Sequence, residues 1–270
     1  MKHQYSLVHL SDINCSPPDF IRAAAAAGYD AVSLRTIPMG LKGEHPHNIA
    51  ADRNLFRETK RAVEDTGITI NDTENARIFD GVDIAFYEPA LAAAAELGIR
   101  HILCNIWTDN RSYYIEKFAQ LCQLAKQYGQ TVNVEFVTWA SVTNLAQTNE
   151  LIRESGQENT GIVLDFLHYH RSRVTLEEVR ATPKSRFHYV HLCDAPAEIP
   201  TEVEALIHTG REERLYPGEG AIHMKEVMEL FPDAVRGIEV PHLKRLAELG
   251  LEEHAKRALE RAKRYFGEEQ

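Results

Sequence analysis

Four ionisable residues stand at the ends of successive apolar, β-rich runs in the second half of the chain. They are Glu135 in "VNVEFV", Asp165 in "GIVLDFLH", His191 in "YVHLCDA" and Glu239 in "GIEVP". Three carboxylates brought together in a low-dielectric cavity would repel one another unless a cation lay between them. Oxygen-rich ligation with one nitrogen suits Mn²⁺, Mg²⁺, Co²⁺ or Zn²⁺. The pattern therefore predicts one divalent metal ion, with these four residues as its ligands.

Each of these residues has a simpler explanation when it is taken alone. A single strand glutamate usually faces solvent or pairs with an arginine, because buried charges occur only when they are compensated. A lone strand histidine is more often a satisfied core or surface residue than a ligand. Four such residues on four successive strands are harder to explain in this way, so the fold that would bring them together decides between the two interpretations.

Short β-rich runs alternate with longer helical stretches along the whole sequence. The runs are 5–10, 31–36, 68–72, 101–107, 131–137, 161–168, 187–195 and 236–240. Several are apolar on consecutive positions, which is typical of parallel strands covered on both faces. Eight such strands with intervening helices predict a single-domain (β/α)₈ TIM barrel over residues 1–270. A doubly wound open sheet is the alternative, but "LSDINCSPPD" after the first run lacks the glycine-rich phosphate turn of that fold.

Capping residues mark the ends of several predicted helices. Ser16 before two prolines indicates a helix start, and Gly28 indicates its end. Thr175 with Glu178 predicts a capping box, and Gly98 and Gly129 are expected to end two further helices.

Two longer segments follow the last two predicted strands. Residues 244–266 are expected to form one amphipathic helix over the last strand. The polar connection 196–220 is expected to fold over the site as a loop.

Composition limits the class of protein. The formal net charge of −10 argues against a nucleic-acid partner. The four cysteines are scattered without a CxxC pair, which fits reduced thiols in a cytoplasm. Neither a signal peptide nor an apolar stretch of membrane-spanning length is visible. We expect a cytoplasmic protein without a membrane partner, and a homodimer is the default expectation for its assembly.

The sequence resembles the xylose-isomerase-like TIM-barrel superfamily of sugar and keto-polyol isomerases, epimerases and dehydratases. Glu135, Asp165, His191 and Glu239 fall where that group places its metal ligands, on strands five to eight. Further similarities are "LDFLH" with His168, "HLCDAP" with Asp194 and "RLYPGEGAIHM", which carries Arg214 and Glu219. The carboxyl-terminal half is most similar to 2-keto-myo-inositol isomerases, and "LDFLH" is shared with 3-dehydroshikimate dehydratases.

Two departures argue against that particular dehydration. The dehydratases tend to carry a histidine two residues after the first ligand glutamate and a basic residue two after the ligand histidine. This chain has Val137 and Cys193 there. Similarity to endonuclease IV is poor, since that relative requires further histidine ligands and a basic face.

The resemblance implies a mechanism and a set of roles. A metal ion chelating a hydroxy-ketone would stabilise an enediolate while two glutamates, Glu135 and Glu239, move the proton. His168 would bind a substrate oxygen, and Arg214 would bind a hydroxyl or carboxylate, with a solvated loop cation as the equal alternative for Arg214. Asp194 is a further candidate substrate contact.

Glu219 is a further candidate substrate contact, or alternatively a residue that orients a metal ligand. No phosphate-binding glycine turn is visible after the last strands, so we expect an unphosphorylated carbohydrate or polyol substrate.

Weaker candidates come from the amino-terminal half. His9, Arg35, Glu74 and Trp107 lie near predicted strand ends, with an Arg35–Glu74 ion pair and a packing role for Trp107 as the simpler interpretations. "HPHN" at 45–48 could be a metal tract, but its loop setting favours a solvated segment.

Three functions remain open from the sequence. The first is an isomerase or epimerase of a keto-sugar or keto-polyol. The second is a dehydratase that expels a β-hydroxyl from an inosose or a dehydroshikimate-like substrate. The third is a barrel kept as a binding module, which would hold no metal tightly.

Overall fold

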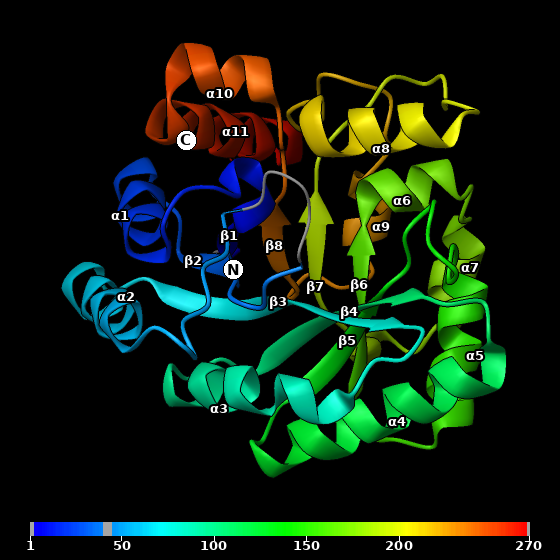
Figure 1. Cartoon of the computed structure of the whole chain (residues 1–270). Coiled ribbons are helices and arrows are strands. Elements are labelled where there is room, and N and C mark those ends of the chain that lie inside the picture. The colour runs from blue at the N-terminus through cyan, green and yellow to red at the C-terminus, as the bar shows by residue number, and fades with distance from the viewer. Residues whose placement is uncertain (1–2, 40–44, 269–270) are drawn as a thin grey trace.

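Eight parallel strands close into one barrel in the computed structural model, which describes residues 3–39 and 45–268 (Figure 1). The strands are β1 (Tyr5–Val8), β2 (Ala31–Arg35), β3 (Thr69–Phe79), β4 (His101–Trp107), β5 (Thr131–Glu135), β6 (Thr160–Asp165), β7 (Phe187–Leu192) and β8 (Val235–Ile238). Each strand pairs with the next in sequence order, and β8 pairs with β1 to close the barrel. The predicted (β/α)₈ architecture is confirmed.

Helices surround the strands on the outside of the barrel (Figure 1). The α-helices of the described residues are α1 (Pro17–Ala27), α2 (Arg53–Thr66), α3 (Glu88–Glu96), α4 (Arg111–Gln127), α5 (Leu145–Ser155), α6 (Phe166–Arg171), α7 (Leu176–Ala181), α8 (Val203–Glu212), α9 (Lys225–Met228), α10 (Leu243–Leu249) and α11 (Leu251–Phe266). Short 3₁₀ turns are η1 (His9–Asp12), η2 (Ile84–Tyr87) and η3 (Lys184–Arg186). In the part of the chain that the structure describes, no helix combines the length and apolarity needed to cross a bilayer.

The predicted helix caps are present. The Ser16 hydroxyl accepts a hydrogen bond from the Asp19 amide at 3.4 Å, and α1 ends at Gly28 with a φ of 94°. A left-handed backbone of this kind is open to glycine without steric cost, which is why the helix stops there. Thr175 and Glu178 form the expected capping box at the start of α7.

Most of the predicted strands end earlier than expected, and two of them, β6 and β7, end three residues earlier. The run 161–168 is strand only to Asp165, whose side chain then accepts the amides of Leu167 and His168 as the N-cap of α6. His168 therefore lies on a helix rather than at a strand end. The run 187–195 is strand only to Leu192.

Two other elements differ from the prediction. The connection 196–220 contains the helix α8, so it is not a structureless loop. The predicted single helix over 244–266 is two helices, because the backbone of Gly250 (φ 73°, ψ 165°) separates α10 from α11. The second of these packs against α1, and its His254 ring nitrogen Nε2 contacts the Val240 carbonyl at 2.9 Å.

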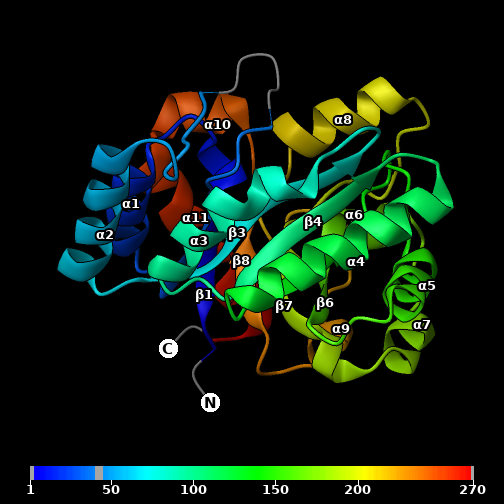
Figure 2. The same ribbon diagram turned by 60° about the horizontal axis from the view of Figure 1, so that its bottom comes forward.

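Side chains alternate between the inside of the barrel and the helix layer, as the two-residue period of a strand requires. Leu103, Val163 and Tyr189 form a small apolar cluster of their own, separate from the large core between strands and helices. Asp165 and His191 come two residues after Val163 and Tyr189, so the alternation places them further along on the same inner side. Figure 2 shows α8 and α10 together at one end of the barrel.

Candidate metal centre and active-site cavity

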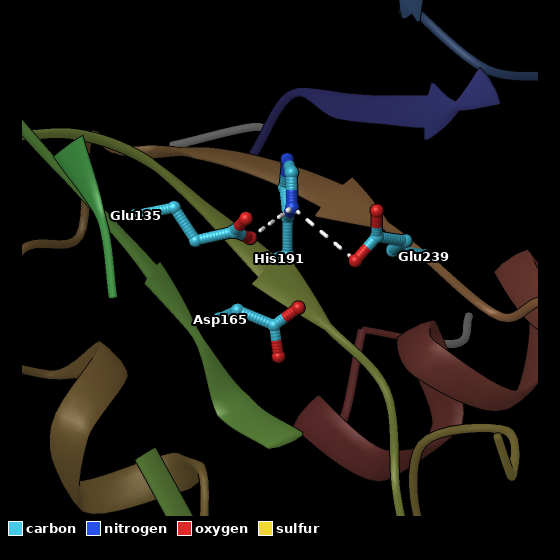
Figure 3. A group of neighbouring side chains, drawn as sticks. All are labelled: Glu135, Asp165, His191 and Glu239. Carbon is cyan, nitrogen blue, oxygen red and sulfur yellow. Dashed lines mark ion pairs between the residues drawn. The ribbon is translucent and has the colours of Figure 1, made fainter. Parts of the chain in front are cut away.

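Four buried residues from consecutive strands meet inside the barrel mouth (Figure 3). Asp165 of β6 pairs in register with His191 of β7, while Glu135 is the last residue of β5 and Glu239 directly follows β8. One ligand atom from each of these residues lies within 4.8 Å of the ligand atoms of the other three. The structure thus brings together the four residues that the sequence singled out as metal ligands.

The His191 ring lies between the two glutamates. Its Nδ1 is 3.5 Å from Glu135 Oε1 and 3.4 Å from Glu239 Oε2, and Figure 3 shows the two carboxylates approaching the ring from opposite sides. Although burial alone favours the neutral ring, the Glu239 and Glu135 carboxylates raise the pKa of His191 well above its ordinary value. Among residues 3–39 and 45–268, neither ring nitrogen has a partner with hydrogen-bond geometry.

These observations fit a divalent cation. Buried polar atoms in proteins are normally satisfied, yet neither His191 ring nitrogen has a hydrogen-bond partner within the described chain. Three carboxylate oxygens and one imidazole nitrogen form a donor set that suits Mn²⁺, Zn²⁺ and similar ions. The cluster has the composition, burial and spacing that such an ion needs.

Arg214 lies inside this cluster and also lines the cavity, so its expected contact with a substrate stays a prediction. Its Nη1 is 2.7 Å from Asp165 Oδ2 and 2.7 Å from Glu239 Oε2, and the side chain is buried. Burial alone would raise the pKa of Asp165, but the Arg214 guanidinium holds it well below its usual range. Burial raises the pKa of Glu239. Two of the four carboxylate and imidazole side chains are therefore already paired to a permanent cation.

His168 lines the cavity from α6 and has a defined tautomer. Its Nδ1 accepts the backbone N–H of Thr138 at 3.2 Å and lies 2.8 Å from the Thr138 hydroxyl. Burial lowers the pKa of His168 to about 3, so the ring is neutral near pH 7 and its proton is on Nε2. The Nε2–H group is thus a donor held in one orientation.

Asn105 is a site residue that the sequence analysis did not identify. Its side-chain amide donates to Glu135 Oε2 at 2.9 Å and to the Glu135 carbonyl at 3.0 Å. The bond fixes the carboxylate of a proposed catalytic group from the neighbouring strand β4. An asparagine in the middle of the apolar run "HILCNIW" was the signal that could have revealed it.

Asp194 and Glu219 lie outside the cavity lining, so the assignment of both to substrate binding is corrected. The Asp194 carboxylate accepts the amides of Ala195, Gly218 and Ile222, which organises the chain after β7. Glu219 is partly buried and forms an ion pair with Arg245 at 2.7 Å.

The cavity above the cluster has a volume of about 350 Å³, within the range of small-molecule sites. Side chains from many strand ends and from the following loops line it. They include Asn14, Arg35, Glu74, Asn105, Trp107, Glu135, Val137, Trp139, His168, Arg211, Arg214, Glu239 and His242. Val137 thus faces the cavity where the resembling dehydratases tend to carry histidine, whereas Cys193 is buried beside Arg214.

The weaker candidates of the amino-terminal half divide into two groups. Arg35 and Glu74 line the cavity and form the expected ion pair at 2.7 Å, and Trp107 lines it as well. His9 is buried beneath, where its Nδ1 accepts the Arg35 amide at 3.0 Å. In the segment 45–48, His47 is buried and stacks on His9, so this part of the segment is packed rather than solvated.

A second acidic group lies deeper in the barrel. Asp72 and Glu74 of β3 place ligand atoms within 4.8 Å of His191 and of each other. Burial, and after it the neighbouring Glu74 charge, raise the pKa of Asp72 to about 7. The run "ITIND" ends at Asp72, but the sequence analysis assigned no role to this residue.

Comparisons with known proteins agree with this fold. A family model described as xylose isomerase-like TIM barrel matches residues 21–265. The inosose isomerase of Bacillus velezensis is 22% identical over 225 residues, which span 77% of this chain and 78% of the relative. The 3-dehydroshikimate dehydratase of Pseudomonas putida is 23% identical over 220 residues, which span 77% of this chain and 32% of the relative.

Among the curated relatives that match, the alignment spans between 32% and 78% of the relative's own length, and for most of them less than two thirds. Among solved structures, the IolI protein with a bound zinc atom superimposes with a TM-score of 0.81 and 16% identity, over 98% of both chains. At this level of identity, the superposition establishes the fold alone.

Proposed function

The chain belongs to the family of xylose isomerase-like TIM barrels, and we propose that it is a divalent-metal-dependent isomerase or epimerase of a keto-sugar or keto-polyol. The observation that carries this proposal is the convergence of Glu135, Asp165, His191 and Glu239 within 4.8 Å beneath a cavity of small-molecule size. The similarity to inosose isomerases supports a cyclic keto-polyol as the substrate class.

The four clustered residues would hold the ion. A bound divalent cation would polarise the substrate carbonyl and thereby make the neighbouring C–H bond more acidic. Three carboxylates and an imidazole that gives up its proton when the ion binds would satisfy the preference of such ions for deprotonated ligands.

Glu135 and Glu239 are the proposed acid–base pair. They flank His191 from β5 and from the end of β8, and both line the cavity (Figure 3). In the proposed reaction one glutamate removes the proton from the hydroxyl-bearing carbon, and the C–H electrons form the double bond of an enediolate. Return of a proton to the adjacent carbon gives the isomer, and return to the opposite face of the same carbon gives the epimer.

Neighbouring side chains support these roles. Asn105 orients Glu135 through its 2.9 Å hydrogen bond, and Arg214 lies 2.7 Å from Glu239. His168 offers its Nε2–H to a substrate oxygen, because its Nδ1 is engaged by the Thr138 amide. Trp107 and Trp139 narrow the cavity, and their aromatic surfaces exclude water from the reacting carbon.

A metal analysis combined with an exchange assay tests the proposal. The purified protein is expected to hold about one divalent ion per chain and to exchange a substrate C–H with deuterium from solvent in a screen of inososes and ketoses. Glu135→Gln and Glu239→Gln are each expected to lower the exchange rate by about 10²–10⁴-fold, since each removes a general acid–base group. The variant Glu219→Gln, outside the cavity lining, serves as the matched control.

Two results would contradict the proposal. Exchange that persists in both glutamate variants would remove them from the acid–base role. Protein that binds no divalent ion and keeps its ligand affinity in the presence of a chelator would favour a binding module instead.

A dehydratase using the same enediolate is the second candidate, because the chain is also similar to a 3-dehydroshikimate dehydratase. Elimination of a β-hydroxyl would give a product lighter by one water, which mass spectrometry separates from an isomer.

A further inference from the structure

Arg211 brings a cation to the cavity from the helix α8. It lines the same cavity as Glu135 and Glu239 and is partly buried there. The cavity wall also includes Arg35 at the end of β2. Arg211 lies in the connection after β7, so Arg35 and Arg211 reach the cavity from different elements of the barrel.

The position of Arg211 is fixed by the contacts of its helix. Arg171 of α6 donates to the Leu206 carbonyl at 2.9 Å and to the Thr209 hydroxyl at 2.6 Å, and Arg214 Nε donates to the Gly210 carbonyl at 2.7 Å. Gly210 lies so close to Trp139 that a methyl carbon there would be 2.7 Å from its ring. Because the contacts of Arg171, Arg214 and Trp139 hold α8 in place, its Arg211 reaches the cavity from a fixed helix.

Among residues 3–39 and 45–268, Arg211 is the arginine of the cavity wall that forms no ion pair within 4.0 Å, although the neighbouring Glu212 charge acts on it. Arg35 is paired with Glu74 at 2.7 Å, and Arg214 is paired with Asp165 and Glu239. The adjacent Glu212 carboxylate is 3.1 Å from His208 Nδ1.

Charge and burial oppose this arrangement unless an anion is present. Burial lowers the pKa of Arg211, the nearby Arg35 and Arg77 charges lower it further, and the Glu212 carboxylate offsets part of this. Arg77 is itself bound to the Met39 carbonyl, so it remains a fixed neighbour. Like charges held close together in a partly buried site are costly, and an anionic ligand group would relieve that cost.

We propose that the cavity takes a hydroxy-ketone bearing a carboxylate, and that Arg211 binds this carboxylate while the hydroxy-ketone end faces Glu135 and Glu239. The identification of the reacting end rests on the proposed function. A guanidinium offers two parallel N–H donors that match a carboxylate. A carboxylate is favoured over a phosphate because one unpaired arginine supplies the positive charge and no glycine-rich phosphate turn follows β7 or β8.

Binding of two unreactive ring polyols tests the proposal without catalysis. Quinate and myo-inositol are both hydroxylated six-membered carbon rings, but only quinate carries a carboxylate. Calorimetry on the full chain with Mn²⁺ is expected to show quinate binding at least tenfold more tightly than myo-inositol. Arg211→Gln is expected to remove this preference, and Arg211→Lys to retain part of it.

The matched control is Arg57→Gln, which removes an exposed arginine of α2 outside the cavity and is expected to keep the full preference. Equal binding of the two polyols to the wild-type protein would overturn the proposal, as would a quinate preference that survives in Arg211→Gln. Arg211-dependent binding of an inositol monophosphate at least tenfold tighter than quinate would overturn the choice of a carboxylate.

The two proposals can fail separately. The polyols are not turned over, so an absence of C–H exchange in the screen would count against the proposed isomerase and leave the measured quinate preference as it stands. Conversely, exchange with neutral inososes at rates equal to those of carboxylated hydroxy-ketones would count against Arg211 as the specificity residue.

Discussion

At the scale of single residues, the charge balance of the cluster depends on Arg214. Three buried carboxylates would repel one another, and from the sequence only a metal ion is expected to compensate their negative charge. The Arg214 guanidinium lies 2.7 Å from Asp165 and from Glu239. The His191 ring lies between Glu135 and Glu239. Part of the negative charge is therefore compensated by the chain itself, and a divalent ion would join a site that is already partly balanced.

Replacing Arg214 tests this compensation. Arg214→Met leaves Asp165 and Glu239 buried without their cation, and loss of one partner from a buried pair costs about 3–5 kcal/mol. We expect the free energy of unfolding in urea with EDTA to fall by about this amount, and Mn²⁺ to restore part of it. The exposed Arg57→Met is the control. A variant as stable as the wild type in EDTA would contradict the role of Arg214.

The sequence specified which residues gather but not how each is paired. Glu135, Asp165, His191 and Glu239 could be identified because strand periodicity and parallel order fix where the ends of strands meet. The partners of Arg214 and Asp194 could not be predicted, because they come from distant segments of the chain. Arg214 contacts Asp165, which is 49 positions away, and Asp194 contacts the amide of Ile222, 28 positions away.

At the scale of elements, the helix α8 is the part of the site that the sequence did not reveal. Its stretch after β7 is rich in Glu and Thr, and only Leu206 and Gly210 of the helix are buried. Val203, Leu206 and Ile207 do follow a helical spacing, but the pattern is short and is surrounded by Glu and Pro residues. Tertiary contacts fix it instead, through Arg171, Arg214 and the close approach of Gly210 to Trp139.

A methyl group at position 210 tests whether this approach is required. Gly210→Ala would put a carbon 2.7 Å from the Trp139 ring, so either the helix or the ring must move. Overpacking of this kind costs about 1–3 kcal/mol. We expect a lower thermal unfolding temperature and a quinate affinity reduced at least threefold, because Arg211 moves with the helix. The exposed Glu204→Ala in α8 should change neither, and an unaltered Gly210→Ala protein would show that the contact is not needed.

At the scale of the whole molecule, buried neutral histidines link stability to pH. His9 is buried beneath the barrel mouth, and burial lowers its pKa to about 3. In the unfolded chain a histidine has a pKa of about 6.5. The unfolded state therefore binds one proton more than the folded state between these values, so the stabilisation from His9 is complete above pH 6.5 and is lost as the pH falls toward 3.

The pH dependence of unfolding tests this contribution. Each pH unit within that window is expected to remove about 1.4 kcal/mol of stability for this one proton. His9→Gln should show a shallower decline between pH 6.5 and 5 in urea unfolding, because glutamine has no proton to gain. His208→Gln, at an exposed position of α8, should keep the wild-type slope. Equal slopes for the wild type and His9→Gln would contradict the argument.

Arg214 also has a consequence for how variants of this protein are interpreted. One guanidinium holds Asp165 and Glu239 in the ion cluster and the Gly210 carbonyl of the helix beside the cavity. Mutations in the ion cluster and mutations in α8 are therefore not expected to have additive effects. A double-mutant cycle between the two regions should return a non-zero coupling energy. By thermodynamic reciprocity, a ligand that shifts the helix alters cation affinity by the same factor that the cation alters affinity for that ligand.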